Sequence, residues 1–270
     1  GFYAENKRLR SIRVQAELTK RFTAEFSIRA FLERYPERTY AQMLDLAKAD
    51  NAHLRRLASE GLRPRLPWAP RLRSFQQDPR PVLAVLELLK DDPVRYVQRS
   101  VANNLNDIAK DHPALAIETC RRWARNAPQG RAWTVRHALR TLIKSGNNDA
   151  IRILGGEVRP RVHIGRVSIT PQCICLGEAV HLAFEVESTA RAAQHLLIDY
   201  AVHFVKANGS ARPKVFKLRT LTMQPGDRAM FSAVVSLAAM TTRRHYPGLH
   251  RVEARINGIA HTLGAFEITA

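Results

Sequence analysis

The sequence predicts a multidomain protein in which an all-α helical repeat array is followed by an all-β sandwich. A chain of 270 residues exceeds the roughly 100–200 residues of a typical single domain. Apolar residues recur every three to four positions in the first part of the chain and every second position in the remainder. The period changes at the Gly155-Gly156 pair, so we place the two domains at residues 1–155 and 156–270.

Short helices separated by turn signals account for the first domain. The turn signals include Pro36, Pro93, Pro113 and Pro128, each of which marks a helix boundary. The apolar spacing predicts helices at Phe22–Tyr35, Thr39–Ala49, Asn51–Leu62, Pro81–Lys90, Val94–Lys110, Ala114–Asn126, Ala132–Lys144 and Asp149–Leu154.

Weak internal similarity indicates that these helices form repeated pairs. The string at Arg99–Leu105 is echoed at Arg136–Leu142, 37 residues later. A period of roughly 40 residues is typical of HEAT-like or armadillo-like arrays. Such arrays stack helix pairs into a curved solenoid with a concave binding face. The first domain is therefore predicted to be a HEAT-like solenoid.

The second domain is predicted to consist of seven short strands. Turn signals such as Asn208-Gly209 and Pro247-Gly248 separate the strands. This density of strands is typical of an immunoglobulin-like sandwich, here without the Cys–Trp–Cys core of antibody domains. The predicted strands are Val162–Thr170, Ala179–Glu187, Leu196–Val205, Lys214–Met223, Ala229–Ala238, His250–Asn257 and Thr262–Thr269.

The charge of the chain suggests a polyanionic partner. Lysine and arginine exceed aspartate and glutamate by 19, and both domains contribute, with net charges of +13 and +6. Phosphate contacts and counterion release favour nucleic acid as the partner, although a charge that serves solubility is the simpler alternative. A composition with 45% hydrophobic and 25% charged residues excludes wholesale disorder. No apolar run approaches the roughly 18–20 residues of a membrane span.

Three cysteines in a long chain argue against a disulfide framework and for a reducing cytoplasm. Cys173 and Cys175 are two positions apart in a strand-like segment and share a face. A second pair of metal ligands is missing nearby, so we expect buried packing thiols rather than a metal site. We expect no metal, no cofactor and a monomer.

The predicted helix Val94–Lys110 carries the most informative polar face. An apolar stripe marks its core face, and Ser100, Asn103, Asn104 and Asp107 share another face. The string from Asn103 to Asp107 is poor in helix-forming residues, so something other than local stability favours it. A solvated or ion-paired aspartate is the alternative to a functional one.

Two further acids stand out by their position. Glu60 and Trp68 lie on the proline-rich stretch Glu60–Pro70, which either packs as a buried connector or sets an aromatic wall beside a carboxylate. Glu25 lies at the head of the first predicted helix, where the helix dipole alone favours an acid.

Three segments together resemble the bacterial DNA alkylation repair glycosylases with HEAT-like repeats, the AlkC/AlkD superfamily. The resemblance lies in Glu60–Trp68, Tyr96–Pro113 and Arg136–Lys144. The predicted C-terminal sandwich is similar to that of the AlkC branch, many of whose members carry an immunoglobulin-like domain. The resemblance extends over nearly the whole chain. Members tend to have additional N-terminal helices, which we expect to be missing before Gly1.

The resemblance implies a monofunctional DNA glycosylase of base excision repair. Its substrates would be cationic N3-alkylated bases, 3-methyladenine and 3-methylcytosine, in double-stranded DNA. Glu25, Glu60 and Asp107 would be the catalytic carboxylates that stabilise an oxocarbenium-like sugar and orient water, and Trp68 would hold the base. The AlkD branch has a tryptophan four residues before its aspartate, whereas this chain has Asn103 there. The superfamily is understood to act without flipping the base into a pocket.

Contacts to DNA are expected from both domains. The concave face of the solenoid and a basic loop between two late strands supply the candidates, although the loop could equally be a solvated hairpin tip. The alternative to an enzyme is a non-catalytic HEAT-repeat scaffold that binds DNA or an acidic protein. The predicted DNA-binding residues are Arg99, Ser100, Asn103, Arg136, Arg140, Lys144, Arg243, Arg244 and His245.

Overall fold

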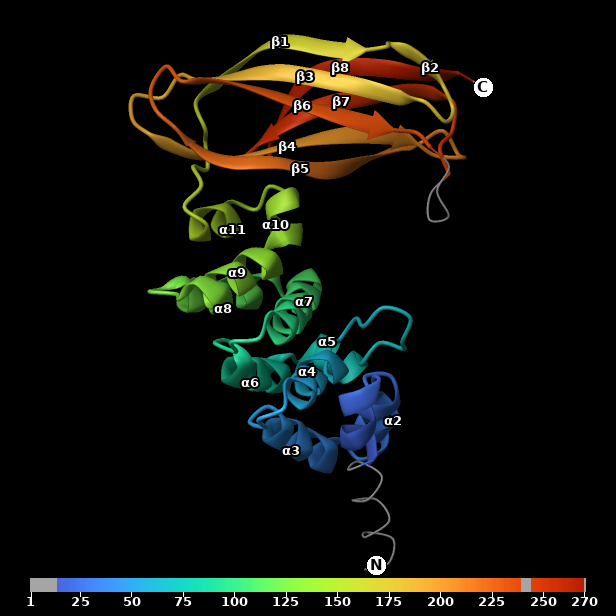
Figure 1. The fold of residues 1–270 in the computed structure, drawn as a ribbon, viewed down its shortest axis with the longest axis vertical. Helices are drawn as coiled ribbons and strands as arrows, with labels where there is room; N and C mark the ends of the chain where they lie inside the picture. Colours follow the sequence, from blue (N-terminus) through green and yellow to red (C-terminus); the bar gives the residue numbers. More distant parts are fainter. Residues whose placement is uncertain (1–13, 239–243, 270) are drawn as a thin grey trace, which may run out of the picture. The chain divides into compact units, whose positions relative to one another are not determined.

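The computed structural model describes residues 14–238 and 244–269 (Figure 1). The chain divides into two compact units, Gly1–Leu142 and Ile143–Ala270. The first unit is helical, and the second contains all of the strands. Helix α11 belongs to the second unit, and the predicted domain boundary at residue 155 lies between this helix and the first strand. A helical region followed by an immunoglobulin-like sandwich is the predicted fold class, which is confirmed.

The predicted helices are present with shifted ends. Residues 14–21 are also helical. The later helices are α2 (Ser27–Arg34), α3 (Pro36–Leu46), α4 (Ala52–Gly61), α5 (Arg73–Gln77), α6 (Arg80–Leu89), α7 (Arg95–Asp111), α8 (Pro113–Ala124), α9 (Gln129–Ala138), α10 (Arg140–Lys144) and α11 (Asn148–Ile153). One predicted helix, 132–144, is divided at Leu139 into α9 and α10. Helix α5 was not predicted.

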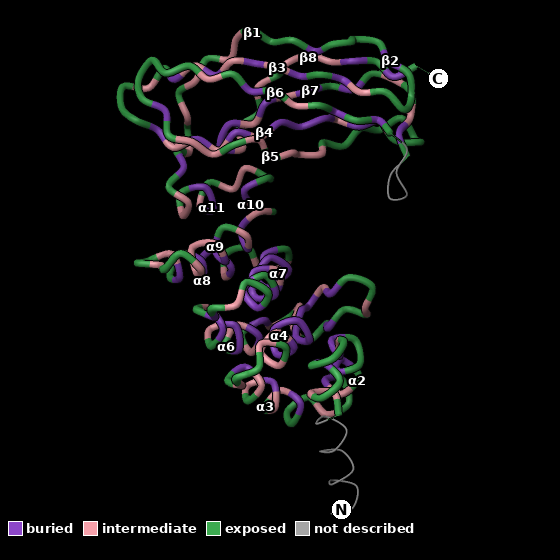
Figure 2. Tube along the Cα trace, viewed as in Figure 1, coloured by how far each residue is buried: buried purple, intermediate pink, exposed green. Residues whose placement is uncertain are grey.

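Helix α7 lies at the centre of the first unit because its apolar stripe is buried among four other helices. It packs against α4, α6, α8 and α9. Val97, Val101, Leu105 and Ile108 have at most 1% of their surface exposed. Figure 2 shows this helix as largely buried. Asp92 accepts a hydrogen bond from the backbone N–H of Val94 (2.9 Å) and so satisfies a donor at the N-terminus of α7.

The second unit is a sandwich of two sheets. Its strands are β1 (Val162–Thr170), β2 (Cys173–Cys175), β3 (Ala179–Ser188), β4 (Gln194–Val205), β5 (Ala211–Met223), β6 (Arg228–Ser236), β7 (Gly248–Ile256) and β8 (Ile259–Thr269). One sheet has the order β1-β3-β6, and the other has the order β2-β8-β7-β4-β5. Only the pairing of β2 with β8 is parallel among the described strands. The core between the sheets includes Phe184 and Phe266, both nearly fully buried.

The cysteines do not all pack as expected. Cys120 is fully buried in α8, and burial raises the pKa of its thiol to about 12. Cys173 and Cys175 are exposed, because they lie on the outward face of β2, a strand of three residues. The expectation of buried packing thiols is therefore wrong for this pair. No helix in the described ranges is long and apolar enough to cross a membrane.

Candidate active site

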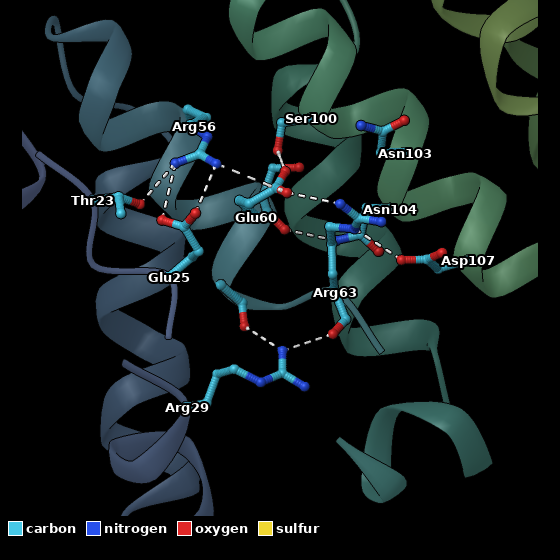
Figure 3. Close-up of polar contacts among 12 residues, drawn as sticks. Thr23, Glu25, Arg29, Arg56, Glu60, Arg63, Ser100, Asn103, Asn104 and Asp107 are labelled. Carbon is cyan, nitrogen blue, oxygen red and sulfur yellow. Dashed lines mark hydrogen bonds and ion pairs between the residues drawn. The ribbon is translucent and has the colours of Figure 1, made fainter. Parts of the chain in front are cut away.

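Three carboxylates from distant parts of the sequence lie together in the first unit (Figure 3). Glu25 precedes α2, Glu60 lies on the last turn of α4, and Asp107 lies on α7. Their exposed fractions are only 8%, 7% and 2%. Burial of an unpaired carboxylate is strongly unfavourable, so each of these groups requires a compensating partner.

Arg56 on α4 joins the first two acids. Its guanidinium donates to both carboxylate oxygens of Glu25 at 3.1 Å, and one nitrogen lies 3.8 Å from Oε1 of Glu60. The same group donates to the hydroxyl of Thr23 at 3.2 Å. Arg56 and Glu60 are four residues apart on one helix, which places them on the same face. The side chain of Glu25 therefore reaches the cluster through Arg56 (Figure 3).

Arg63 bridges the other two acids. Its Nε donates to Oδ2 of Asp107 at 2.8 Å, and its Nη1 donates to Oε1 of Glu60 at 2.7 Å. Burial disfavours the charge of Arg63, but the two carboxylates outweigh burial and raise the pKa of this guanidinium. The remaining carboxylate oxygens are also bonded, with Ser100 Oγ on Glu60 at 2.6 Å and Lys110 Nζ on Asp107 at 2.9 Å. Every oxygen of these two acids therefore has a fixed donor.

The asparagine-rich string of α7 connects this helix to the neighbouring helices. Asn104 Nδ2 donates to the carbonyl of Ser59 at 2.7 Å. Asn106 Nδ2 donates to the carbonyl of Ala138 at 2.7 Å. Asn103 accepts a hydrogen bond from Arg140 at 3.0 Å. These side chains hold α7 in register with the helices before and after it, which explains why a string of poor helix formers occurs in this helix.

Trp68 lies apart from the packed acids, on the loop that follows α4. Its side chain is 97% exposed, and its backbone is in the left-handed region, with φ of 62°. The buried Arg29 holds the base of this loop by donating to the carbonyls of Gly61 (3.4 Å), Arg63 (2.8 Å) and Pro70. Burial lowers the pKa of Arg29. The loop is therefore anchored firmly while the aromatic ring at its tip is in solvent.

The predicted DNA-binding residues of the first unit differ in how far they are exposed. Arg99 and Arg136 are exposed and make no ion pair with any residue that the structure describes. Arg140 is half-buried beside Asn103. Ser100, in contrast, is only 3% exposed and is bonded to Glu60, so it lies within the acid cluster rather than on the surface.

The candidates of the second unit also differ in their surroundings. Lys144 is exposed, and its Nζ lies 3.4 Å from the carbonyl of Val215. Arg244 is exposed, with its guanidinium 5.6 Å from the centre of the Tyr246 ring. His245 is only 8% exposed and lies against Phe204, at 5.3 Å between ring centres, instead of at a loop tip. Arg243 falls outside the described residues.

Sequence reasoning missed the cations that hold the acids. Arg56, Arg63 and Lys110 each lie three or four residues from Glu60 or Asp107. For Arg56 on α4 and Lys110 on α7, such spacing places opposite charges side by side on a helix and was a usable signal, whereas Arg63 lies just beyond the end of α4. Within the described ranges, no group of three histidine, cysteine or acidic side chains is arranged to hold a metal ion.

Comparison with known proteins places this architecture in a family. The solved structure of Pseudomonas fluorescens alkylpurine DNA glycosylase AlkC, bound to DNA containing an abasic site analog, matches with a TM-score of 0.93 and 43% identity. The match covers 99% of this chain and 74% of that one. The chain belongs to the AlkC family.

The chain is also similar to a curated bacterial protein. The uncharacterized protein YhaZ of Bacillus subtilis (strain 168) is 38% identical over 248 residues, which are 92% of this chain and 69% of YhaZ. The family model described as "Uncharacterised protein YhaZ, C-terminal Ig-like domain" matches residues 163–270. The predicted family and the predicted C-terminal immunoglobulin-like domain are both confirmed.

Proposed function

We propose that this AlkC-family chain is a monofunctional DNA glycosylase that hydrolyses the N-glycosidic bond of cationic N3-alkylated bases in double-stranded DNA. 3-Methyladenine and 3-methylcytosine are the expected substrates, and the reaction begins base excision repair. The observation that carries the proposal is the gathering of Glu25, Glu60 and Asp107 in a chain with a net charge of +19. The likeness to the P. fluorescens enzyme supports the same activity.

The chemistry of the substrate explains why carboxylates suffice. When the bond between the sugar C1′ and the glycosidic nitrogen of the base breaks, which is N9 in 3-methyladenine and N1 in 3-methylcytosine, the electron pair stays with the cationic base, which leaves as a neutral molecule. The leaving group therefore needs no proton from the enzyme. The sugar becomes oxocarbenium-like, as in glycoside hydrolysis, and a water oxygen bonds to C1′ while one proton is released. Positive charge develops on the sugar, so fixed carboxylates nearby lower the barrier.

We infer different roles for the three acids. Asp107 and Glu60 line the sugar of the lesion, and Asp107 orients the attacking water. Arg63 fixes the position of both carboxylates because it bonds to each of them. Glu25 acts as a positioning residue, since its described contact with the cluster is through Arg56. This network holds the acids in place before substrate binds, as electrostatic preorganisation requires.

Trp68 and the surface arginines would bind the DNA. An exposed aromatic ring on an anchored loop is suited to contact a cationic base, for which cation–π attraction contributes about 0.5–2 kcal/mol. Among the predicted phosphate contacts, Arg99 and Arg136 are exposed and without ion-pair partners in the described chain. Arg244 would serve the same purpose in the second unit.

Base release from methylated duplex DNA tests the proposal. The experiment compares wild type with Asp107→Asn and with Asp91→Asn, at a salt concentration where all three bind DNA equally. Asp91 is a matched control because its carboxylate is 47% exposed and pairs with Arg131 at 2.8 Å, away from the acid cluster. We expect single-turnover release of 3-methyladenine to fall by at least about 100-fold in Asp107→Asn and to be unchanged in the control.

A non-catalytic DNA-binding scaffold is the alternative. It predicts that wild type binds the duplex but releases no base, and that neither substitution changes DNA affinity. A duplex containing a single 3-methylcytosine extends the test to the second substrate. If Asp107→Asn fails to fold, Glu60→Gln tests the same cluster through a different hydrogen bond. Wild-type rates in both variants would refute the carboxylate mechanism.

A further inference from the structure

A row of cationic and aromatic side chains runs along α7 and α9 toward Asp107. On α7 the row has Arg95, Arg99 and Asn103, spaced four residues apart, as one face of a helix requires. On the following helices Trp133, His137 and Arg140 take the matching places. Each of these lies 37 or 38 residues after its counterpart on α7, which is the repeat spacing.

The contacts along this row are ordered. The guanidinium of Arg95 lies 4.1 Å from the centre of the Trp133 ring. The Trp133 ring stacks on the imidazole of His137, with 4.9 Å between ring centres and 9° between planes. Arg140 then donates to the backbone carbonyl of His137 (2.5 Å) and to Asn103 (3.0 Å). Aromatic stacking and cation–π contact fix the orientation of the imidazole.

The charges around His137 are not balanced. Two guanidinium groups act electrostatically on the ring, those of Arg140 at the start of α10 and Arg99 on α7. Burial and these two cations lower the pKa of His137 to about 4. Within the described chain, neither ring nitrogen of His137 makes a hydrogen bond, and Arg99 has no ion-pair partner. Other arginines of the same unit, such as Arg55 and Arg65, are paired with aspartates.

We propose that Arg99, His137 and Arg140 form a site for one phosphodiester of the DNA backbone, with the imidazole held in place by Trp133. A phosphate placed there would supply the missing negative charge and accept hydrogen bonds from groups that lack acceptors. Arg95 supports the site through the stack. The inference rests on the proposed function, because it assigns the DNA strand a position relative to Asp107.

The position is consistent with a contact near the lesion. Arg99 and Asp107 are eight residues apart on α7, a rise of about 12 Å along the helix axis. The site would therefore hold the DNA backbone near the cleaved base and help to fix the register of the strand.

The salt dependence of DNA affinity tests the site. The probe is a short fluorescent duplex carrying an abasic-site analogue, and the variants are Arg99→Ala and Arg125→Ala. Arg125 is a matched control, being an exposed arginine of the same unit at the end of α8, outside the row. Loss of one phosphate contact reduces the slope of log Kobs against log salt by about 0.9. We expect this reduction in Arg99→Ala and an unchanged slope in Arg125→Ala.

Two further measurements distinguish a phosphate contact from a merely structural role. The control Arg125→Ala should keep the wild-type single-turnover rate of base release at every protein concentration, whereas Arg99→Ala should lose more activity at low protein concentration than at saturation, because a phosphate contact acts through DNA affinity. In NMR titrations of the histidine rings, the pKa of His137 should rise when the duplex binds, because a phosphate beside the ring favours its protonated form.

An unchanged slope in Arg99→Ala, or an unchanged pKa of His137 in the complex, would overturn the site. A lower rate at saturation with an intact slope would also overturn it, since Arg99 would then act on the acid cluster. If wild type releases no base but the slope still falls in Arg99→Ala, the phosphate site stands and the proposed glycosylase activity fails. The two proposals are therefore tested separately.

Discussion

Replacement of Arg63 by methionine tests whether the buried ion pairs support the first unit. Arg63 is 7% exposed and bonds to both Glu60 and Asp107, which are 7% and 2% exposed. Removal of one partner from a buried pair costs about 3–5 kcal/mol, because a charge remains without compensation. Lys110 and Ser100 still hold one oxygen of each acid, so we expect a loss near the lower value, about 3 kcal/mol.

Urea unfolding followed by tryptophan fluorescence measures this loss in the relevant unit alone. All three tryptophans, Trp68, Trp123 and Trp133, belong to residues 1–142. The signal therefore reports the helical unit, although the whole chain does not unfold as one two-state domain. With a urea dependence of about 1–3 kcal/mol per molar, a loss of 3 kcal/mol lowers the midpoint by about 1–3 M.

Arg80→Met is the control for the loss of an arginine. Arg80 also pairs with an aspartate, Asp78, at 2.7 Å, but its side chain is 79% exposed. An exposed pair contributes little because water screens both charges, so the midpoint should not move measurably. If Arg63→Met unfolds at the same urea concentration as Arg80→Met, the buried carboxylates do not depend on Arg63, and the argument from their burial is refuted.

Two predictions concern the second unit, each measured by thermal or urea unfolding followed by circular dichroism. Gly258→Ala should lower the free energy of unfolding by about 2–5 kcal/mol, because φ is +79° and a Cβ would lie 2.4 Å from the Cα of Gly146. Gly226 has the same φ but open space around it, so Gly226→Ala should lower this free energy by only about 1–2 kcal/mol. Equal losses in the two variants would contradict the close approach of Gly258 to Gly146. Burial raises the pKa of Asp199 to about 6, so the folded state holds a proton that the unfolded chain releases near pH 4, and stability falls as pH rises between these values. Asp199→Asn should therefore be more stable than wild type at pH 7, by about 1–2 kcal/mol after allowance for the partial exposure of this side chain. The gain in stability should vanish below pH 4. A gain that does not change with pH would show that the charge of Asp199 is not the cause of the gain.

The periodicity of the sequence predicted the fold well where elements are long and half-buried. The predicted strand Val162–Thr170 has the bounds of β1, and α7 begins and ends one residue later than predicted. Helix α5 and strand β2 have five and three residues, too few to show a period. The break at Leu139 is also invisible to a periodic pattern, because apolar spacing continues across it.

The candidate site was harder to predict because its members are far apart in sequence. Glu25 and Asp107 are 82 residues apart, and no local pattern places them together. The family resemblance named both, whereas the helical spacing around Glu60 could have revealed Arg56. The burial of Ser100 and His245 depends on packing by other elements, which the alternation of neighbouring residues does not show.

Under the proposed function, the charge balance of the acid cluster reconciles DNA binding with the stabilisation of a cation. Glu25, Glu60 and Asp107 carry three negative charges, and Arg56, Arg63 and Lys110 carry three positive charges. The cluster is therefore neutral as a whole and does not repel the phosphate backbone from a distance. At short range, a cation that develops on a sugar placed against the cluster would be attracted by its oriented carboxylates. Replacement of Arg56 or Arg63 would disturb both properties at once, whereas loss of a surface arginine such as Arg99 would weaken DNA binding alone.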